Sequence, residues 1–207
     1  MTFTLDSVQE AIEDIRNGKI VIVVDDETRE NEGDMICASE CINPELVNFM
    51  LKEARGLMCV ALTKERCQEL NLNLMVKTNT ALHQTAFTVS VDLLGFGCTT
   101  GVSASDRAKT IQALVDPKMV PINFAVPGHI FPLVANSKGL RERHGHTEAA
   151  IDLPRMAGLI PSGVLIEVLS KDGSMARLPE LRQIADRFQL KLISIKDILE
   201  YMSNTEG

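Results

Sequence analysis

The densest group of chemically active side chains lies early in the chain, in the segment Asp25-Asp26-Glu27-Thr28-Arg29-Glu30-Asn31-Glu32-Gly33-Asp34. Six of these ten residues carry carboxylates, which repel one another unless a cation offsets their charge. The pattern favours a site for a hard divalent metal ion, with Arg29 available to hold an anionic substrate. A solvated surface loop is the alternative, because most charged runs are solvated. Gly33 within the segment favours a tight functional turn over that alternative.

Histidines supply the second set of candidates. Three of the four, His129, His144 and His146, lie beside a glycine, where the backbone can approach a ligand closely. His146 directly precedes Thr147 and Glu148, which we predict to begin a helix, and the free N–H groups of a helix N-terminus favour anions. This segment is therefore a candidate for one half of a phosphate or metal site. His144 and His146 also have the spacing of a zinc-binding pair, but no third ligand is evident nearby in the sequence.

Two further positions carry polar groups where a ligand would fit. The segment Cys98-Thr99-Thr100-Gly101-Val102-Ser103-Ala104-Ser105-Asp106-Arg107 gathers hydroxyls, a glycine and an arginine at a predicted helix N-terminus, which suits a phosphate monoester. An ordinary helix cap with a surface arginine is an equal alternative. Glu167 interrupts the apolar stretch 163–169, and a buried carboxylate is paired, binds a metal or stays protonated. The last state suits a general acid or base, whereas a glutamate on an edge strand that faces water is the alternative.

Strands and helices alternate along the chain and must position these groups. Runs of apolar and β-branched residues predict strands at 20–24, directly before the acidic segment, and at 57–62, 87–92, 129–134, 163–169 and 191–195. Cap signals and apolar periodicity predict helices from Asp6 (with Gln9 as its capping-box partner), from Asn43, after Thr63, from Ser103 or Ser105, from Thr147, and at 179–188 and 196–202. No glycine-rich phosphate motif follows a strand, which disfavours a doubly wound nucleotide-binding fold. We predict one α/β (α+β) domain over residues 1–207, with a mixed sheet flanked by helices.

Composition excludes several classes of function. The net charge is −7, from 21 basic and 28 acidic residues, which opposes non-specific nucleic-acid binding. No apolar stretch reaches the ~18 residues of a membrane span, and residues 1–6 lack the features of a signal peptide. The five cysteines form no C-x-x-C pair and stand in apolar surroundings, so we expect reduced thiols and a cytoplasmic protein.

Several of these segments together closely resemble the 3,4-dihydroxy-2-butanone 4-phosphate synthase family of riboflavin biosynthesis. The resemblance is carried by the acidic segment 25–34, by the segment 99–107, by Pro127-Gly128-His129-Ile130-Phe131-Pro132-Leu133, by Gly145-His146-Thr147-Glu148-Ala149-Ala150 and by Ser162-Gly163-Val164-Leu165-Ile166-Glu167. These motifs are long, occur in the family's order and span nearly the whole chain.

The resemblance implies a lyase that converts D-ribulose 5-phosphate to L-3,4-dihydroxybutan-2-one 4-phosphate and releases carbon 4 as formate. It implies Mg²⁺, with Mn²⁺ left open as a replacement, no organic cofactor, and a homodimer with active sites at the subunit interface. By resemblance, the metal ligands are Glu30 and His146, and the acid–base pair is His129 and Glu167. The implied substrate-binding residues are Arg29, Glu30, Asp34, Arg143, His144, Gly145, His146, Thr147 and Glu167, with Thr99, Ser103, Asp106 and Arg107 from the hydroxyl-rich segment.

The sequence departs from the family pattern at two positions. Family members often carry glycine where this chain has Gln84 and where it has His144, and neither departure touches the implied catalytic residues. Some relatives continue into a GTP cyclohydrolase II domain, whose zinc-binding cysteine cluster is absent here, so we expect no such activity. Whether the chain is free-standing or part of such a fusion stays open. A metal-dependent sugar-phosphate isomerase without formate release and a non-catalytic phosphosugar-binding protein are the alternative functions.

Overall fold

In the computed structural model, which describes residues 4–205, the β-branched run before the acidic segment forms strand β1 (Val21–Val24), and all of its residues are buried. Ile22 and Val24 pack into one core cluster, while Val21 and Val23 pack into a second cluster on the opposite face. A strand that is buried on both faces reads as a continuous apolar run rather than an alternating one. The local sequence of β1 therefore already requires helices on both sides of the sheet.

The sheet contains seven strands in the order β4-β5-β3-β6-β2-β1-β7. The bounds are β2 (Gly33–Ala38), β3 (Cys59–Leu62), β4 (Val91–Leu93), β5 (Phe124–Val134), β6 (Gly163–Glu167) and β7 (Lys191–Ser194). β1 pairs parallel with β7 and β3 pairs parallel with β5, whereas the other neighbouring strands pair antiparallel. The predicted mixed sheet within a single α/β domain is confirmed.

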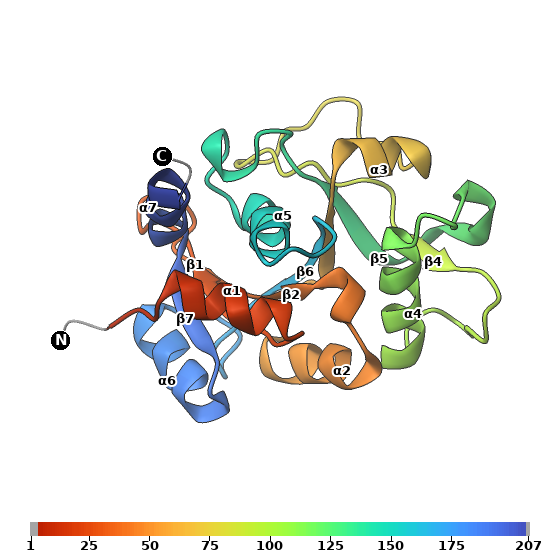
Figure 1. Cartoon of the computed structure of the whole chain (residues 1–207). Coiled ribbons are helices and arrows are strands. Elements are labelled where there is room, and N and C mark those ends of the chain that lie inside the picture. The colour runs from red at the N-terminus through yellow and green to blue at the C-terminus, as the bar shows by residue number, and fades with distance from the viewer. Residues whose placement is uncertain (1–3, 206–207) are drawn as a thin grey trace.

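Helices cover both faces of the sheet (Figure 1). One face carries α1 (Val8–Arg16), α5 (His146–Met156) and α7 (Ile195–Thr205), and Figure 1 shows α1 beside α5. The other face carries α2 (Pro44–Glu53), α3 (Lys64–Glu69), α4 (Ala104–Val115) and α6 (Leu178–Phe188). None of the helices within residues 4–205 combines the length and apolar character that a membrane crossing requires.

The predicted helix caps at Asn43, Thr63 and Ser103 are confirmed, and the one at Asp6 is wrong. Asn43 accepts a hydrogen bond from the N–H of Leu46 at the start of α2, and Ser103 caps α4 in the same way. Asp6 does not cap α1, because the N-cap position belongs to Ser7. The carboxylate of Asp6 instead accepts hydrogen bonds from Arg182 and from the backbone N–H of Leu192, which joins the start of the chain to α6 and β7.

The predicted strands differ from the observed ones in three places. Residues 33–38 form the interior strand β2, which the sequence did not predict because Ile36 is its only β-branched residue. The strand predicted at 87–92 is reduced to β4, with isolated bridges at Phe87 and Thr88. The strand predicted from His129 begins earlier, at Phe124.

Candidate active site

The acidic segment folds around its own first carboxylate. Asp25, whose side chain is fully buried, accepts hydrogen bonds from the backbone N–H of Glu30 at 3.0 Å and of Glu32 at 2.9 Å. Its Oδ2 also lies 2.9 Å from the guanidinium of Arg29. Because these bonds close the loop directly after β1, they fix the positions of Arg29 and Glu30 at the end of the sheet.

Four ionisable side chains converge at this end of the sheet. The antiparallel pairing of β2 with β6 places Asp34 directly opposite Glu167. His146, the first residue of α5, lies with its Nδ1 3.5 Å from Glu30 Oε2 and 3.9 Å from Asp34 Oδ1. Within residues 4–205, Asp34 Oδ1 and His146 Nε2 are buried and make no hydrogen bond. Buried polar atoms without a partner are costly, so this cluster is arranged for a ligand rather than for stability.

The cluster carries an excess of negative charge that shifts its pKa values. His146, with help from Arg29 and against the effect of burial, lowers the pKa of Glu30 to about 2. Burial and the neighbouring Glu167, Glu30 and Glu32 raise the pKa of Asp34 to about 7, although His146 opposes this rise. Burial alone would lower the pKa of His146, but the surrounding carboxylates, chiefly Asp34 and Glu30, raise it to about 9. The carboxylates of this cluster therefore favour a positive charge beside them.

These groups line a cavity of about 120 Å³ together with two arginines. Arg29 pairs with Glu30 at 2.6 Å, and Arg143 pairs with the buried Glu148 at 2.6 Å. Thr147, in the first turn of α5, also lines the cavity. The cavity thus offers two guanidinium groups to an anionic ligand beside a carboxylate-rich cluster.

Glu167 belongs to the interior of the sheet rather than to its edge. β6 lies between β3 and β2, so the alternative of an edge-strand glutamate is wrong. Its Oε2 accepts a hydrogen bond of 2.8 Å from the backbone N–H of Leu57. A side chain at Gly56 would place its Cβ 2.5 Å from the same oxygen, so a glycine is needed there for this close approach. Glu167 is therefore fixed by the neighbouring backbone while it lines the cavity.

The donor set of the cluster fits a hard divalent cation. Ligand atoms of Asp25, Glu30 and His146 all lie within 4.8 Å of one another. The oxygens of Asp25 already accept the hydrogen bonds that close the loop, which leaves Glu30 and His146 as the available ligands. Few protein ligands and several retained waters are typical of Mg²⁺. His144 lines a different cavity beside residues 24–29, so the two histidines do not form the zinc pair that their spacing suggested.

Some predicted site residues lie outside this cavity. His129 is half exposed on β5 and contacts Asp92, and it is not among the residues that line the cavity. The segment 99–107 is also elsewhere, and several of its N–H groups are already occupied. The carboxylate of Asp106 accepts hydrogen bonds from the N–H and the hydroxyl of Thr99 and from the N–H of Gly101. Within one chain, the structure therefore brings together only part of the predicted site: Arg29, Glu30, Asp34, Arg143, His146, Thr147 and Glu167.

Three residues of the site had no role of their own in the sequence prediction, although two of them, Asp25 and Glu32, belong to the predicted acidic segment. Glu32 and Cys59 line the cavity, and Asp25 closes the loop. Burial, followed by the charges of Glu167 and Asp34, raises the pKa of the Cys59 thiol. Its apolar neighbours in the sequence predicted a buried thiol but gave no sign that β3 begins at the cavity.

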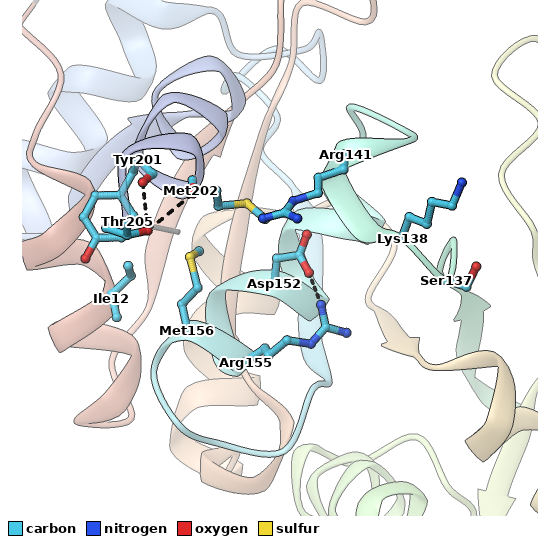
Figure 2. Close-up of a pocket in the computed structure, with 10 residues that line it drawn as sticks. All are labelled: Ile12, Ser137, Lys138, Arg141, Asp152, Arg155, Met156, Tyr201, Met202 and Thr205. Atoms are coloured by element: carbon cyan, nitrogen blue, oxygen red, sulfur yellow. Dashed lines mark hydrogen bonds and ion pairs between the residues drawn. The ribbon is translucent and has the colours of Figure 1, made fainter. Parts of the chain in front are cut away.

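A separate cavity of about 520 Å³ lies between α5 and α7 (Figure 2). It is lined by Lys138, Arg141 and Arg155 together with apolar side chains such as Met156 and Met202. Its acidic residue, Asp152, forms an ion pair with Arg155, as Figure 2 shows. Because it lacks histidine and cysteine, this cavity offers far less catalytic chemistry than the carboxylate cluster.

Comparison with known proteins points to one family. Residues 9–201 match the family model of 3,4-dihydroxy-2-butanone 4-phosphate synthase. The riboflavin biosynthesis protein RibBA of Cytophaga hutchinsonii is 66% identical over 203 residues, which cover 98% of this chain and 50% of that protein. The RibBA protein of Parabacteroides distasonis is 57% identical with the same coverage. The chain thus spans about half the length of these curated relatives.

Solved structures give the same family. A crystal structure of 3,4-dihydroxy-2-butanone 4-phosphate synthase in complex with two magnesium ions superposes with a TM-score of 0.93 and 40% identity. The match covers 98% of this chain and 99% of that chain. RibBX from A. baumannii, a two-domain 3,4-dihydroxy-2-butanone 4-phosphate synthase, is 46% identical with a TM-score of 0.90, over 95% of this chain and 57% of that one.

Proposed function

Since the chain belongs to the 3,4-dihydroxy-2-butanone 4-phosphate synthase family, we propose that it is a carbon–carbon lyase of riboflavin biosynthesis. The reaction converts D-ribulose 5-phosphate to L-3,4-dihydroxybutan-2-one 4-phosphate and formate. The observation that carries this proposal is the convergence of Arg29, Arg143, the Glu30–His146 pair and Glu167 on one cavity. A phosphosugar requires cationic side chains for its phosphate, and its rearrangement requires acid–base groups beside its carbonyl.

Glu30 and His146 are the residues that would hold Mg²⁺ in this enzyme. When bound, the ion would supply positive charge next to the oxygen atoms of the substrate. The buried atoms Asp34 Oδ1 and His146 Nε2, which make no hydrogen bond within the described residues 4–205, support a ligand at this position. Manganese as a replacement, the absence of an organic cofactor and a cytoplasmic location stay predictions.

The side chains of the cavity bind and orient the substrate. Arg29 and Arg143 are each held by a carboxylate, so their guanidinium groups are fixed before a phosphate arrives. Glu167 accepts the N–H of Leu57 through one oxygen, and we assign its carboxylate to proton transfer at the sugar carbons. Binding energy from the phosphate then positions the reacting carbons against Glu167.

The second acid–base residue, His129, reaches the cavity from a partner copy in this proposal. Two groups of exposed apolar side chains support a homodimer. In the sequence, one group lies in the segments 94–102 and 120–126, which flank Asp92 and His129, and the other consists of Leu57, which lines the cavity, and residues of the segment 74–82. The first contains Leu94, Phe96, Val102, Val120, Ile122 and Val126, and the second contains Leu57, Leu74, Met75, Val76 and Leu82. In a two-fold symmetric dimer, the first group of each subunit would pack on the second group of the other. This arrangement would bury all four apolar groups and bring His129 of each subunit to the cavity of its partner.

Labelled substrate tests the reaction. ¹³C NMR of the protein with Mg²⁺ and ribulose 5-phosphate labelled at carbon 4 should show labelled formate, and EDTA should abolish it. Label that stays in a five-carbon sugar phosphate would establish the isomerase alternative instead. No turnover by a folded, Mg²⁺-supplied protein would contradict the lyase proposal.

Mixing two inactive variants tests the shared site. His129→Ala and Glu167→Gln should each lose about 100-fold or more of the wild-type activity when assayed alone. After subunit exchange an equal mixture should regain about a quarter of the wild-type activity, since about half of the dimers then hold one intact site of two. A mixture that stays inactive despite exchange would place both residues in the same chain's site.

A further inference from the structure

The backbone around His129 is irregular in a way that depends on one side chain. In the pairing of β4 with β5, Val91 lies opposite Ile130, but the next residue, Asp92, lies opposite Ala125. Residues 126–129 therefore leave the ladder as a bulge directly opposite Asp92. Bulges re-aim side chains and are common next to active sites. Here the bulge projects His129 out of β5.

Asp92 holds this bulge through both of its oxygens. Oδ1 accepts a hydrogen bond of 2.9 Å from the backbone N–H of His129, and Oδ2 lies 2.6 Å from Nδ1 of the same residue. The carboxylate is shielded, with 14% of its side chain exposed against 47% for the imidazole. A side chain at Gly101 would place its Cβ 2.1 Å from Oδ2, so the segment 99–107 packs closely over Asp92. One carboxylate thus joins two segments that the family resemblance assigns to the site.

The contact also settles which ring nitrogen is available for chemistry. A carboxylate only accepts hydrogen bonds, so Nδ1 of His129 must carry the proton that it shares with Asp92. The neutral ring then has a lone pair on Nε2, the nitrogen directed away from Asp92. Which nitrogen of a histidine works is commonly set by the hydrogen bond that the other nitrogen makes.

We infer that Asp92 is a positioning residue that fixes the orientation and the tautomer of His129, so that Nε2 exchanges protons with the substrate. The inference rests on the proposed lyase function, in which His129 is an acid–base residue. Nε2 takes one proton from the substrate and later returns one, while Nδ1 stays protonated and Asp92 stays a carboxylate throughout. A role confined to stabilising the bulge is the competing explanation.

Asp92→Asn separates these two explanations because it keeps the shape of the side chain but reverses the direction of its hydrogen bond with Nδ1 of His129. The amide oxygen can still accept the backbone N–H of His129, but the amide NH₂ now donates to Nδ1. The proton of the neutral imidazole then moves to Nε2, which can no longer accept one. We expect kcat to fall by about 100-fold, the lower end of what acid–base catalysis contributes, with KM and the urea midpoint unchanged. Asp172→Asn is the matched control, since Asp172 caps an exposed turn at Ser174 and should leave kcat unchanged.

Two further measurements make the result specific. ¹⁵N spectra of histidine-labelled protein should show His129 protonated at Nδ1 in the wild type and at Nε2 in Asp92→Asn. Added to His129→Ala, the Asp92→Asn change should reduce kcat no further, because Asp92 acts only through the imidazole. Wild-type kcat in Asp92→Asn, or an Nε2-protonated ring in the wild type, would overturn the inference.

These measurements can contradict the lyase proposal and the role of Asp92 separately. A wild-type protein that releases no formate would contradict the lyase proposal. The ¹⁵N spectrum of the wild type would still show whether Asp92 fixes the tautomer of the His129 imidazole. Formate release by the wild type together with an active Asp92→Asn variant would retain the lyase and remove the role of Asp92.

Discussion

The ion pair between Arg143 and Glu148 allows a quantitative test of how the cavity is built. Glu148 lies in the first turn of α5 with 2% of its side chain exposed, and its Oε2 is 2.6 Å from Arg143. Its other oxygen accepts the backbone N–H of Asn136 at 3.0 Å. Glu148→Gln keeps an oxygen for Asn136, but it turns an amide NH₂ group, which carries no charge and cannot accept a hydrogen bond, toward the guanidinium.

Burial sets the size of the expected effect. Hydrogen bonds to charged groups contribute about 1.5–3 kcal/mol, and breaking a fully buried pair costs about 3–5 kcal/mol. Arg143 is 24% exposed and keeps its contacts with His83 O and Thr85 Oγ1. We therefore expect Glu148→Gln to lower the free energy of unfolding by about 2 kcal/mol, in the lower part of these ranges.

Urea unfolding measures this loss against a control pair in the same chain. Arg66 lies 2.8 Å from Glu69, a similar distance, but the Glu69 side chain is 62% exposed. Glu69→Gln should cost less than about 0.5 kcal/mol, because exposed ion pairs contribute little. Equal effects of the two substitutions would refute the argument that burial decides the strength of the Arg143 pair.

The same substitution should also weaken substrate binding. Arg143 lines the cavity, and Glu148 fixes its guanidinium there. If about 1.4 kcal/mol of this fixation is lost, KM for ribulose 5-phosphate should rise about tenfold. An unchanged KM in a destabilised Glu148→Gln variant would show that Arg143 does not contact the substrate.

Three further predictions concern the metal, the pH dependence and the backbone. Glu30→Gln should weaken Mg²⁺ binding by at least about tenfold in calorimetry, whereas unchanged affinity would exclude Glu30 as a ligand. The pKa of Asp6 lies below its ordinary 3.8, because the hydrogen bonds from Arg182 and the N–H of Leu192 outweigh the opposing effect of burial. The ionised Asp6 therefore stabilises the fold above pH 3.8, and this contribution is lost as the pH falls through the lower folded-state pKa. In urea unfolding from pH 5 to pH 3, the free energy of unfolding should fall less steeply for Asp6→Asn than for the wild type. Gln84 has φ +51°, where glycine is unstrained, so Gln84→Gly should stay within about 0.5 kcal/mol of the wild type in thermal unfolding and Gln84→Val should lose more than about 1 kcal/mol.

Local signals explain why much of the fold could be predicted. The β-branched run of β1, the caps at Asn43 and Ser103 and the apolar faces of the helices act over a few residues, so they are visible in the sequence. Gln84 is a similar case, since a departure from a family glycine coincides with a left-handed backbone. Strand β2 was not predicted because its place inside the sheet comes from its partners β1 and β6 rather than from its own residues.

The missing parts of the site are contacts between distant residues. Asp92 and His129 meet only because a bulge in β5 faces β4, and neither residue indicates the other in the sequence. Leu57 fixes Glu167 through a backbone N–H, which no side-chain pattern reveals. The family resemblance identified His129 and Glu167, but it did not identify the groups that hold them.

The pairing of β2 with β6 brings carboxylates together at a place where a bound cation would stabilise them. Register places Asp34 opposite Glu167, and like charges that face each other across a sheet destabilise it. Glu30 and Glu32 add negative charge next to Asp34, and the carboxylates around His146, chiefly Asp34 and Glu30, raise the pKa of its buried ring to about 9. A sheet selected for stability alone would carry an apolar pair at this register, as Met35 and Ile166 do one position further along. The strand ends are therefore arranged for the ligand, and the core beneath them, which is packed on both faces of the sheet, keeps the repelling carboxylates in place.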